Sequence, residues 1–142
     1  MAAPLQIDVR APRFAAAVTS VVLAVALLLG SGWLVAVQAL VFAVGVGAGL
    51  RRSPYGLVFR LLVAPRLGPA RETEPEAAPR FAQLVGLLFA IAGAAGYLLG
   101  APVLGAVATG FALVAALLNA ATGFCLGCEF YLIARRALPA RA

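Results

Sequence analysis

Two long stretches without a charged residue dominate the sequence. The first runs from Phe14 to Leu50 and has 37 residues, and the second runs from Phe81 to Cys128 and has 48. A helix that crosses a bilayer needs about 20 apolar residues, with a lower limit of about 17. Each stretch is therefore long enough for two spans. With 64% hydrophobic residues and a mean hydropathy of +1.05, the chain is predicted to be an integral membrane protein.

Breaks that contain glycine divide both stretches. Gly30-Ser31-Gly32 falls near the middle of the first and Gly100-Ala101-Pro102 near the middle of the second, and glycine and proline are strong turn signals. We therefore predict an all-α membrane protein, a four-transmembrane-helix bundle made of two helical hairpins, in one integral membrane domain over residues 1–142. The predicted helices are about 14–30, 33–50, 81–99 and 103–124. No signal-peptide cleavage motif ends the first run, so this run is expected to remain as a span.

The segments outside the predicted spans are short and charged. Within the loop 51–80, the part from Ser53 to Arg66 is apolar but too short and too interrupted by arginine to cross a bilayer. We expect it to be an amphipathic interfacial segment, with Arg60 and Arg66 among the lipid headgroups. The other predicted segments are a loosely ordered or interfacial lead (1–13), an exposed linker (68–79) and a C-terminal tail (129–142).

The basic residues indicate how the chain lies in the membrane. All eleven are arginines, and they fall in the lead, the loop and the tail, which four spans place on one side. Because cytoplasmic segments carry the excess of basic residues, and because this composition is typical of a GC-rich bacterial genome, we predict a multi-pass protein of the bacterial inner membrane with both termini cytoplasmic. The net charge of +6 does not indicate a nucleic-acid partner, since the arginines form no continuous stripe.

The only two cysteines, Cys125 and Cys128, are spaced C-x-x-C near the end of the second stretch. Thiols three residues apart on a helix can form a disulfide, and free N–H groups at a helix N-terminus make the leading thiol a nucleophile. Redox exchange and carriage of a persulfide sulfur both follow from that. Metal binding would require two copies of the chain, because there is no histidine and one pair is half of a four-cysteine site. We predict Cys125 and Cys128 as the catalytic residues, with no cofactor and no metal; the alternative is that both are apolar filler.

Five further residues surround this pair as supporting candidates. Asn119, Gly123 and Gly127 recur every four residues and would share one helix face, where small residues let a neighbouring helix approach. Two functional alternatives stay open. Asn119 would line a path to the cysteines, or the glycines would loosen the fourth helix, so that Cys128, Glu129 and Tyr131 begin a separate interfacial helix.

The two halves of the chain open alike. Arg13-Phe14-Ala15 precedes the first predicted hairpin and Arg80-Phe81-Ala82 precedes the second, 67 residues later. Two helices per unit return the chain to the same side, so a repeat of this kind would be parallel, about an axis along the membrane normal. The alternative is a chance match in an alanine-rich chain.

Several motifs together resemble a known family. These are the Arg-Phe-Ala openings, the central Arg-Arg-Ser-Pro-Tyr-Gly (51–56), Pro-Arg-Phe-Ala-Gln (79–83), and the closing stretch from Asn119 through Gly123-Phe124-Cys125-Leu126-Gly127-Cys128-Glu129-Phe130-Tyr131. The chain resembles the domain of unknown function 4395 family of small bacterial membrane proteins. The resemblance covers nearly the whole chain and implies a four-helix membrane protein, no established activity, and a link to sulfur or thiol metabolism. Thr122-Gly123-Phe124-Cys125 is also similar to the membrane domain that accompanies some rhodaneses.

Two functions compete on the sequence. The first is a membrane thiol or sulfane-sulfur handling protein, in which the pair at the cytoplasmic boundary exchanges electrons or sulfur with a thioredoxin-like or rhodanese-like cytoplasmic partner, with passage of a small sulfur species as an extension. The second is a non-catalytic membrane scaffold whose basic loop docks a partner or anionic lipid. Whether the protein is an enzyme stays open. Transport would call for a homodimer, because one four-helix unit of this size has little room for a pore.

Overall fold

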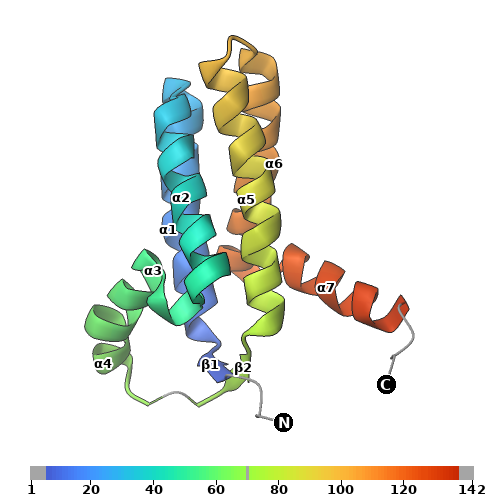
Figure 1. The fold of residues 1–142 in the computed structure, drawn as a ribbon. Coiled ribbons are helices and arrows are strands. Elements are labelled where there is room, and N and C mark those ends of the chain that lie inside the picture. The colour runs from blue at the N-terminus through green and yellow to red at the C-terminus, as the bar shows by residue number, and fades with distance from the viewer. Residues whose placement is uncertain (1–5, 70, 138–142) are drawn as a thin grey trace.

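The computed structural model describes residues 6–69 and 71–137, and most of them are helical. Helices α1, α2, α5 and α6 pack side by side as a bundle (Figure 1). Three of them, α1, α5 and α6, are long and apolar enough to cross a membrane by length and composition, and α2 is a shorter apolar helix of 17 residues. The chain is therefore an all-α membrane protein. The bundle helices are α1 (Arg10–Leu29), α2 (Gly32–Ala48), α5 (Ala77–Leu98) and α6 (Pro102–Thr122).

Small residues let the bundle helices approach closely. A Cβ added at Gly93 of α5 would lie 2.5 Å from the Thr109 hydroxyl of α6, and one at Gly96 would overlap the backbone of Gly105. Close backbone approach of this kind is how membrane helices gain packing energy where apolar burial provides little. The core of the bundle is formed by a cluster of buried residues from three helices: Ala26, Val35, Phe42, Ala90 and Ala94.

Tight turns join consecutive helices at one end of the bundle. Gly30 ends α1 in the left-handed conformation (φ 62°), and the Ser31 hydroxyl caps α2 by accepting a hydrogen bond from the Leu34 N–H at 3.2 Å. Gly100 (φ 90°) makes the corresponding turn between α5 and α6. Both turns fall at the breaks expected from the sequence. The N-terminal strand and the last helix lie at the opposite end, together with every described arginine (Figure 1).

The segment between α2 and α5 is helical as far as Leu67 and leads away from the bundle (Figure 1). Arg60 and Arg66, which were expected on a membrane-surface helix, both lie in helical turns of this segment. A π-helical turn precedes Pro65, which has no N–H for the regular ladder. Phe59 is buried against the bundle while Leu61 and Leu62 are exposed, so the segment has one packed side and one open side. Its elements are η1 (Leu50–Arg52), α3 (Pro54–Val58), η2 (Phe59–Val63) and α4 (Ala64–Leu67).

The expectation of a loosely ordered lead and an exposed linker was wrong for part of both segments. Strand β1 (Gln6–Asp8) pairs antiparallel with β2 (Thr73–Pro75), with Ile7 opposite Glu74. The pairing joins segments 67 residues apart, and the Ile7 side chain becomes buried. Local composition gave no signal for it because both strands are short and polar. Residues 1–5 and 70 lie outside the described residues.

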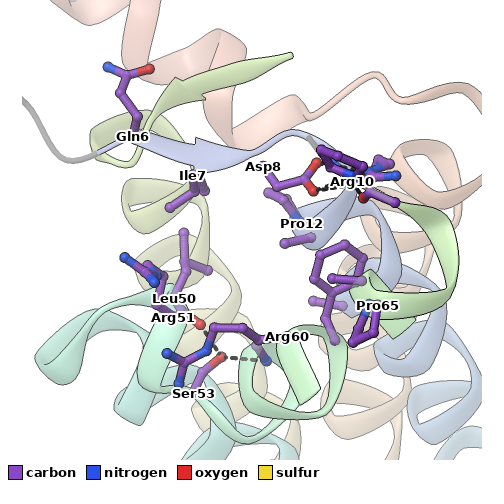
Figure 2. Close-up of a pocket in the computed structure, with 17 residues that line it drawn as sticks. Gln6, Ile7, Asp8, Arg10, Pro12, Leu50, Arg51, Ser53, Arg60 and Pro65 are labelled. Atoms are coloured by element: carbon purple, nitrogen blue, oxygen red, sulfur yellow. Dashed lines mark hydrogen bonds and ion pairs between the residues drawn. The ribbon is translucent and has the colours of Figure 1, made fainter. Parts of the chain in front are cut away.

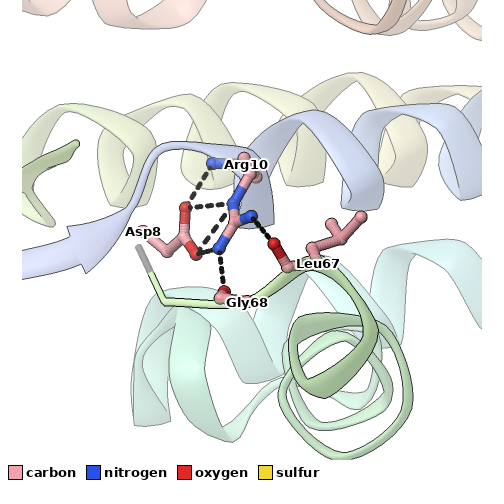
Figure 3. Close-up of polar contacts among 4 residues, drawn as sticks. All are labelled: Asp8, Arg10, Leu67 and Gly68. Atoms are coloured by element: carbon pink, nitrogen blue, oxygen red, sulfur yellow. Dashed lines mark hydrogen bonds and ion pairs between the residues drawn. The ribbon is translucent and has the colours of Figure 1, made fainter. Parts of the chain in front are cut away.

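Arg10 forms an ion pair with Asp8 and hydrogen bonds that link the start of α1 to the end of α4 (Figure 3). The Arg10 guanidinium donates to both oxygens of Asp8, with a closest N–O distance of 2.7 Å, and also to the carbonyls of Leu67 and Gly68 at 3.4 and 3.0 Å. The hydrogen bonds from Arg10 lower the pKa of Asp8. Asp8 is therefore held as the carboxylate that this contact needs.

The helix ends differ from the predicted ones where charged residues were taken as boundaries. Both α1 and α5 begin about one turn early, at Arg10 and Ala77, because an arginine in a first turn can extend its side chain beyond the apolar part. The fourth bundle helix ends at Thr122 rather than 124. The predicted tail is largely a helix, α7 (Leu126–Ala137), and residues 138–142 lie outside the described residues.

The two Arg-Phe-Ala openings make equivalent contacts in the two halves. Arg13 of α1 donates to the carbonyls of Ala120 and Ala121 at the end of α6, at 3.2 and 3.1 Å. Arg80 of α5 donates to the carbonyls of Val46 and Gly47 at the end of α2, at 2.7 and 3.0 Å. The first helix of each half thus satisfies the last carbonyls of the other half's second helix, where a cation is also favoured by the helix dipole.

Candidate functional site: the Cys125–Cys128 cavity

The turn between α6 and α7 places Cys125 at the start of a new helix. Gly123 ends α6 in the left-handed conformation (φ 79°), with its N–H bonded to the Asn119 carbonyl at 2.8 Å. The Thr122 hydroxyl then accepts a hydrogen bond from the Phe124 N–H at 3.2 Å, which directs the chain away from the α6 axis. The Cys125 carbonyl accepts from the Glu129 N–H at 3.0 Å, the first bond of α7. Cys125 is therefore the N-cap residue of α7.

The two sulfurs are bonded to each other in the structure, with the Cα atoms 5.2 Å apart. The N–H of Cys128 also donates to the Cys125 sulfur at 3.2 Å. When the pair is reduced, this N–H and the positive end of the α7 dipole favour the thiolate of Cys125 over its thiol. Both cysteines are half-buried, so a reagent can approach the pair from one side.

The pair lines a cavity of about 940 Å³ that we call the cysteine cavity. Its walls come from the start of α1, from β2, from the end of α6 and from α7. Charges of both signs surround it, since Arg13, Glu72, Glu74, Glu129 and Arg135 are among the lining residues. The cavity therefore combines apolar surface with charged groups of both signs, which suits a ligand that carries both kinds of group, such as a peptide.

The supporting candidates do not share one helix face. Asn119 is in the last turn of α6, Gly123 ends that helix, and Gly127 is already in α7. The one-face prediction is wrong because Gly123 breaks the helix. The structure agrees with the alternative in which a separate helix contains Cys128, Glu129 and Tyr131. Asn119 lines the cysteine cavity.

Gly127 brings α7 against α5. A Cβ at Gly127 would lie 2.6 Å from both the Cα and the Cβ of Ala82, closer than real Cβ contacts allow. Next to this crossing the Tyr131 ring packs on Phe81, with centroids 5.6 Å apart, and its hydroxyl accepts from Arg135 at 3.1 Å. Glu129 is exposed at the rim. These contacts fix the direction of α7 and hence the position of the disulfide.

Three charged residues distant in the chain are among the lining residues that escaped prediction from the sequence. Arg13, Glu72 and Glu74 are far from the cysteines in the chain and reach the cavity through α1 packing and the β1–β2 pair. Burial, and then the neighbouring charge of Glu72, raise the pKa of Glu74. The repeated Arg-Phe-Ala opening was the only sequence signal that bore on any of them.

A smaller cavity of about 260 Å³ lies on the other side of the cysteine turn, within the bundle. Phenylalanine and alanine side chains dominate it, and Asn119 and Cys125 line both cavities. The cysteine turn is thus the wall between a charged cavity and an apolar one. Among residues 6–69 and 71–137, no group of three or more His, Cys, Asp or Glu side chains could hold a metal ion.

A third cavity, of about 650 Å³, is enclosed by β1, the start of α1 and the segment from η1 to Pro69 (Figure 2). We call it the first-half cavity. Arginines and apolar side chains line it, and no cysteine does. Of the cavities described here, the cysteine cavity is the one that combines open access with a nucleophile.

The fold and the site together define a helical membrane protein with a two-cysteine site at a helix N-terminus. Residues 7–136 match the family described as domain of unknown function (DUF4395), and the chain belongs to that family. No curated protein and no solved structure matches the chain. The similarity to the membrane domain that accompanies some rhodaneses rests on four residues alone, 122–125.

Proposed function

We propose that this protein handles thiols or sulfane sulfur at the membrane through Cys125 and Cys128. The observation that carries the proposal is the arrangement of the pair: Cys125 caps α7, receives the Cys128 N–H on its sulfur, and faces an open, charged cavity. A cysteine that served only as filler would need neither the helix cap nor the access.

Thiol exchange at this pair proceeds in two steps. The Cys125 thiolate attacks one sulfur of a partner disulfide, so that a mixed disulfide forms and the partner's other sulfur leaves as a thiolate. The Cys128 thiolate then attacks the Cys125 sulfur, closes the intramolecular disulfide and releases the second partner thiolate. Two electrons move from the cysteine pair to the partner, and the reverse sequence reduces the pair.

Sulfur transfer uses the same two residues. The Cys125 thiolate accepts the outer sulfur atom of a donor persulfide, and the donor leaves as a thiolate. The Cys128 thiolate then attacks the Cys125 sulfur, which releases hydrosulfide and leaves the disulfide. In both reactions Cys125 forms the first covalent bond with the partner's sulfur, and Cys128 then attacks Cys125 to release the product.

The membrane arrangement forms part of the proposal. We take α1, α2, α5 and α6 as four spans in two hairpins, with the arginine-bearing end in the cytoplasm. At about 1.5 Å per residue, the 17 residues of α2 give about 25 Å, near the lower limit for a span. A thioredoxin-like or rhodanese-like protein would then meet the cysteine cavity from the cytoplasm, and coupled passage of a sulfur species would call for a homodimer.

A trapping experiment tests the thiol function. In Cys128→Ser the resolving thiol is absent. When the reduced variant is mixed with an oxidised thioredoxin-like protein, we expect Cys125 to accumulate as a mixed disulfide with that protein, visible by non-reducing gel electrophoresis and mass spectrometry. Cys125→Ser is the matched control and should give no adduct. Equal adduct formation by both variants, or by neither, would favour the scaffold function instead.

A further inference from the structure

The first-half cavity has an apolar floor and a charged rim. Ile7, Leu50 and Phe59 line it and are themselves buried, with exposed fractions of 4%, 6% and 4%. Ala15 and Pro65 are among the other apolar lining residues. Its lining residues come from the start of α1 and from the segment after α2 (Figure 2), so the cavity lies beside one end of the apolar bundle helices, where a membrane protein meets lipid headgroups.

Two arginines at this cavity carry uncompensated charge. Arg51 and Arg60 line it, are exposed, and form no ion pair with any described acid. Arg10 also lines it, but Asp8 neutralises its charge and two carbonyls occupy its other donors (Figure 3). The net charge of the described lining is therefore +2, and an anion is the complementary ligand.

Two contacts beside this cavity match contacts at the cysteine turn. The Ser53 hydroxyl accepts from the Gly56 N–H at 3.1 Å, as the Cys125 sulfur accepts from Cys128 at 3.2 Å. The ring contact of Phe14 with Phe59, at 5.8 Å between centroids, matches that of Phe81 with Tyr131 at 5.6 Å. The two halves thus hold equivalent frameworks around different side chains.

The first-half framework cannot hold a cysteine pair. A Cβ at Gly56 would overlap the Leu50 carbonyl oxygen, so this position excludes any side chain without a backbone shift. Ser53 has its hydroxyl committed, donating to the Leu50 carbonyl at 2.8 Å while capping α3. The first-half cavity therefore offers no thiol chemistry, and its exposed charged groups are Arg51 and Arg60.

We propose that the first-half cavity binds the phosphate group of an anionic phospholipid, with Arg51 and Arg60 on the phosphate and the lipid's apolar part against Phe59 and Leu50. Arginine suits phosphate through its planar, forked donors. The apolar floor favours a lipid over free inorganic phosphate, because a lipid can place its apolar part against this floor and inorganic phosphate cannot.

Lipid titration of the full-length protein in a neutral detergent tests this proposal. By native mass spectrometry, phosphatidylglycerol should bind the wild type more tightly than phosphatidylcholine, and Arg51→Gln/Arg60→Gln should weaken phosphatidylglycerol binding about 30-fold, since each arginine contributes about fivefold. Arg52→Gln/Arg66→Gln is the matched control, because it removes the same charge from the same segment at residues that do not line the cavity.

Equal weakening in the two double variants would overturn the proposal, because the effect would then be one of overall charge. So would inorganic phosphate that competes with phosphatidylglycerol at equal concentration. If the double variant does not fold, the single variant Arg60→Gln serves, with about fivefold weakening expected, and unchanged binding in it would count against the site.

Discussion

At the scale of single residues, glycines decide where the cysteine pair sits. Gly123 supplies the positive φ that ends α6, and Gly127 supplies the missing side chain where α7 crosses α5 at Ala82. A helix that continued straight past Gly123 would carry Cys125 in its interior, where no free N–H points at the sulfur. The reactivity proposed for Cys125 therefore depends on these two backbone positions.

Because α7 crosses α5 closely at Gly127, replacing this glycine with alanine should lower the stability of the protein. Gly127→Ala should destabilise the protein by about 1–3 kcal/mol, because the added Cβ has no space beside Ala82. Gly110→Ala in α6 is the control, since nothing lies within 4 Å of a Cβ there, and it should be neutral or stabilising by up to about 1 kcal/mol. Thermal unfolding in detergent measures both, and equal effects would show that α7 does not pack on α5 in this way.

At the scale of elements, each half of the bundle satisfies the helix ends of the other. Arg80 bonds the last carbonyls of α2 and also the buried Glu76 at 3.3 Å, and Glu76 accepts from the Leu50 N–H at 3.3 Å. This network ties α5 to the end of α2 and to η1. Arg13 makes the corresponding but more exposed contact at the end of α6.

Loss of the Arg80 network should be costly. Arg80→Gln leaves Glu76 buried without its cation and two carbonyls without a donor, so we expect a loss of about 1.5–3 kcal/mol in the free energy of unfolding. Arg71→Gln removes the same charge from an exposed linker residue and should change stability by less than about 0.5 kcal/mol. Denaturation of both variants in detergent separates the two effects; a loss no larger in Arg80→Gln than in Arg71→Gln would contradict this account of the network.

The sequence predicted the elements better than it predicted their partners. Uncharged stretches and the breaks at Gly30 and Gly100 were enough for the helices and turns, because hydropathy and glycine act locally. The β1–β2 pair depends on a contact between segments far apart, for which one sequence holds no signal. The repeated Arg-Phe-Ala opening drew attention to Arg13 but did not indicate that its side chain reaches the end of α6. The cysteine pair was evident from its spacing, whereas its cavity was not, since Glu74 and Arg13 come to it only through the fold.

At the scale of the whole molecule, the two halves share matching local contacts around different side chains. One half presents Ser53 and free arginines beside an apolar floor, and the other presents Cys125 and Cys128 beside mixed charges. The residues that line both cavities come from the end of the bundle that bears the arginines, and the two tight turns lie at the other end (Figure 1). Under the two proposals, lipid binding and thiol chemistry would both take place at this end of the bundle.

The most direct test of this account is the alkylation of single-cysteine variants in oriented vesicles with a membrane-impermeant maleimide. In reduced inside-out vesicles, Cys125 (in Cys128→Ser) should react faster than Cys128 (in Cys125→Ser), with its rate rising at a pH below about 8.5, the ordinary thiol value. A cysteine placed at Ser31 in a Cys125→Ser/Cys128→Ser background should react only in right-side-out vesicles. A Cys125 that reacts no faster than Cys128, or that reacts from the same side as position 31, would contradict the account.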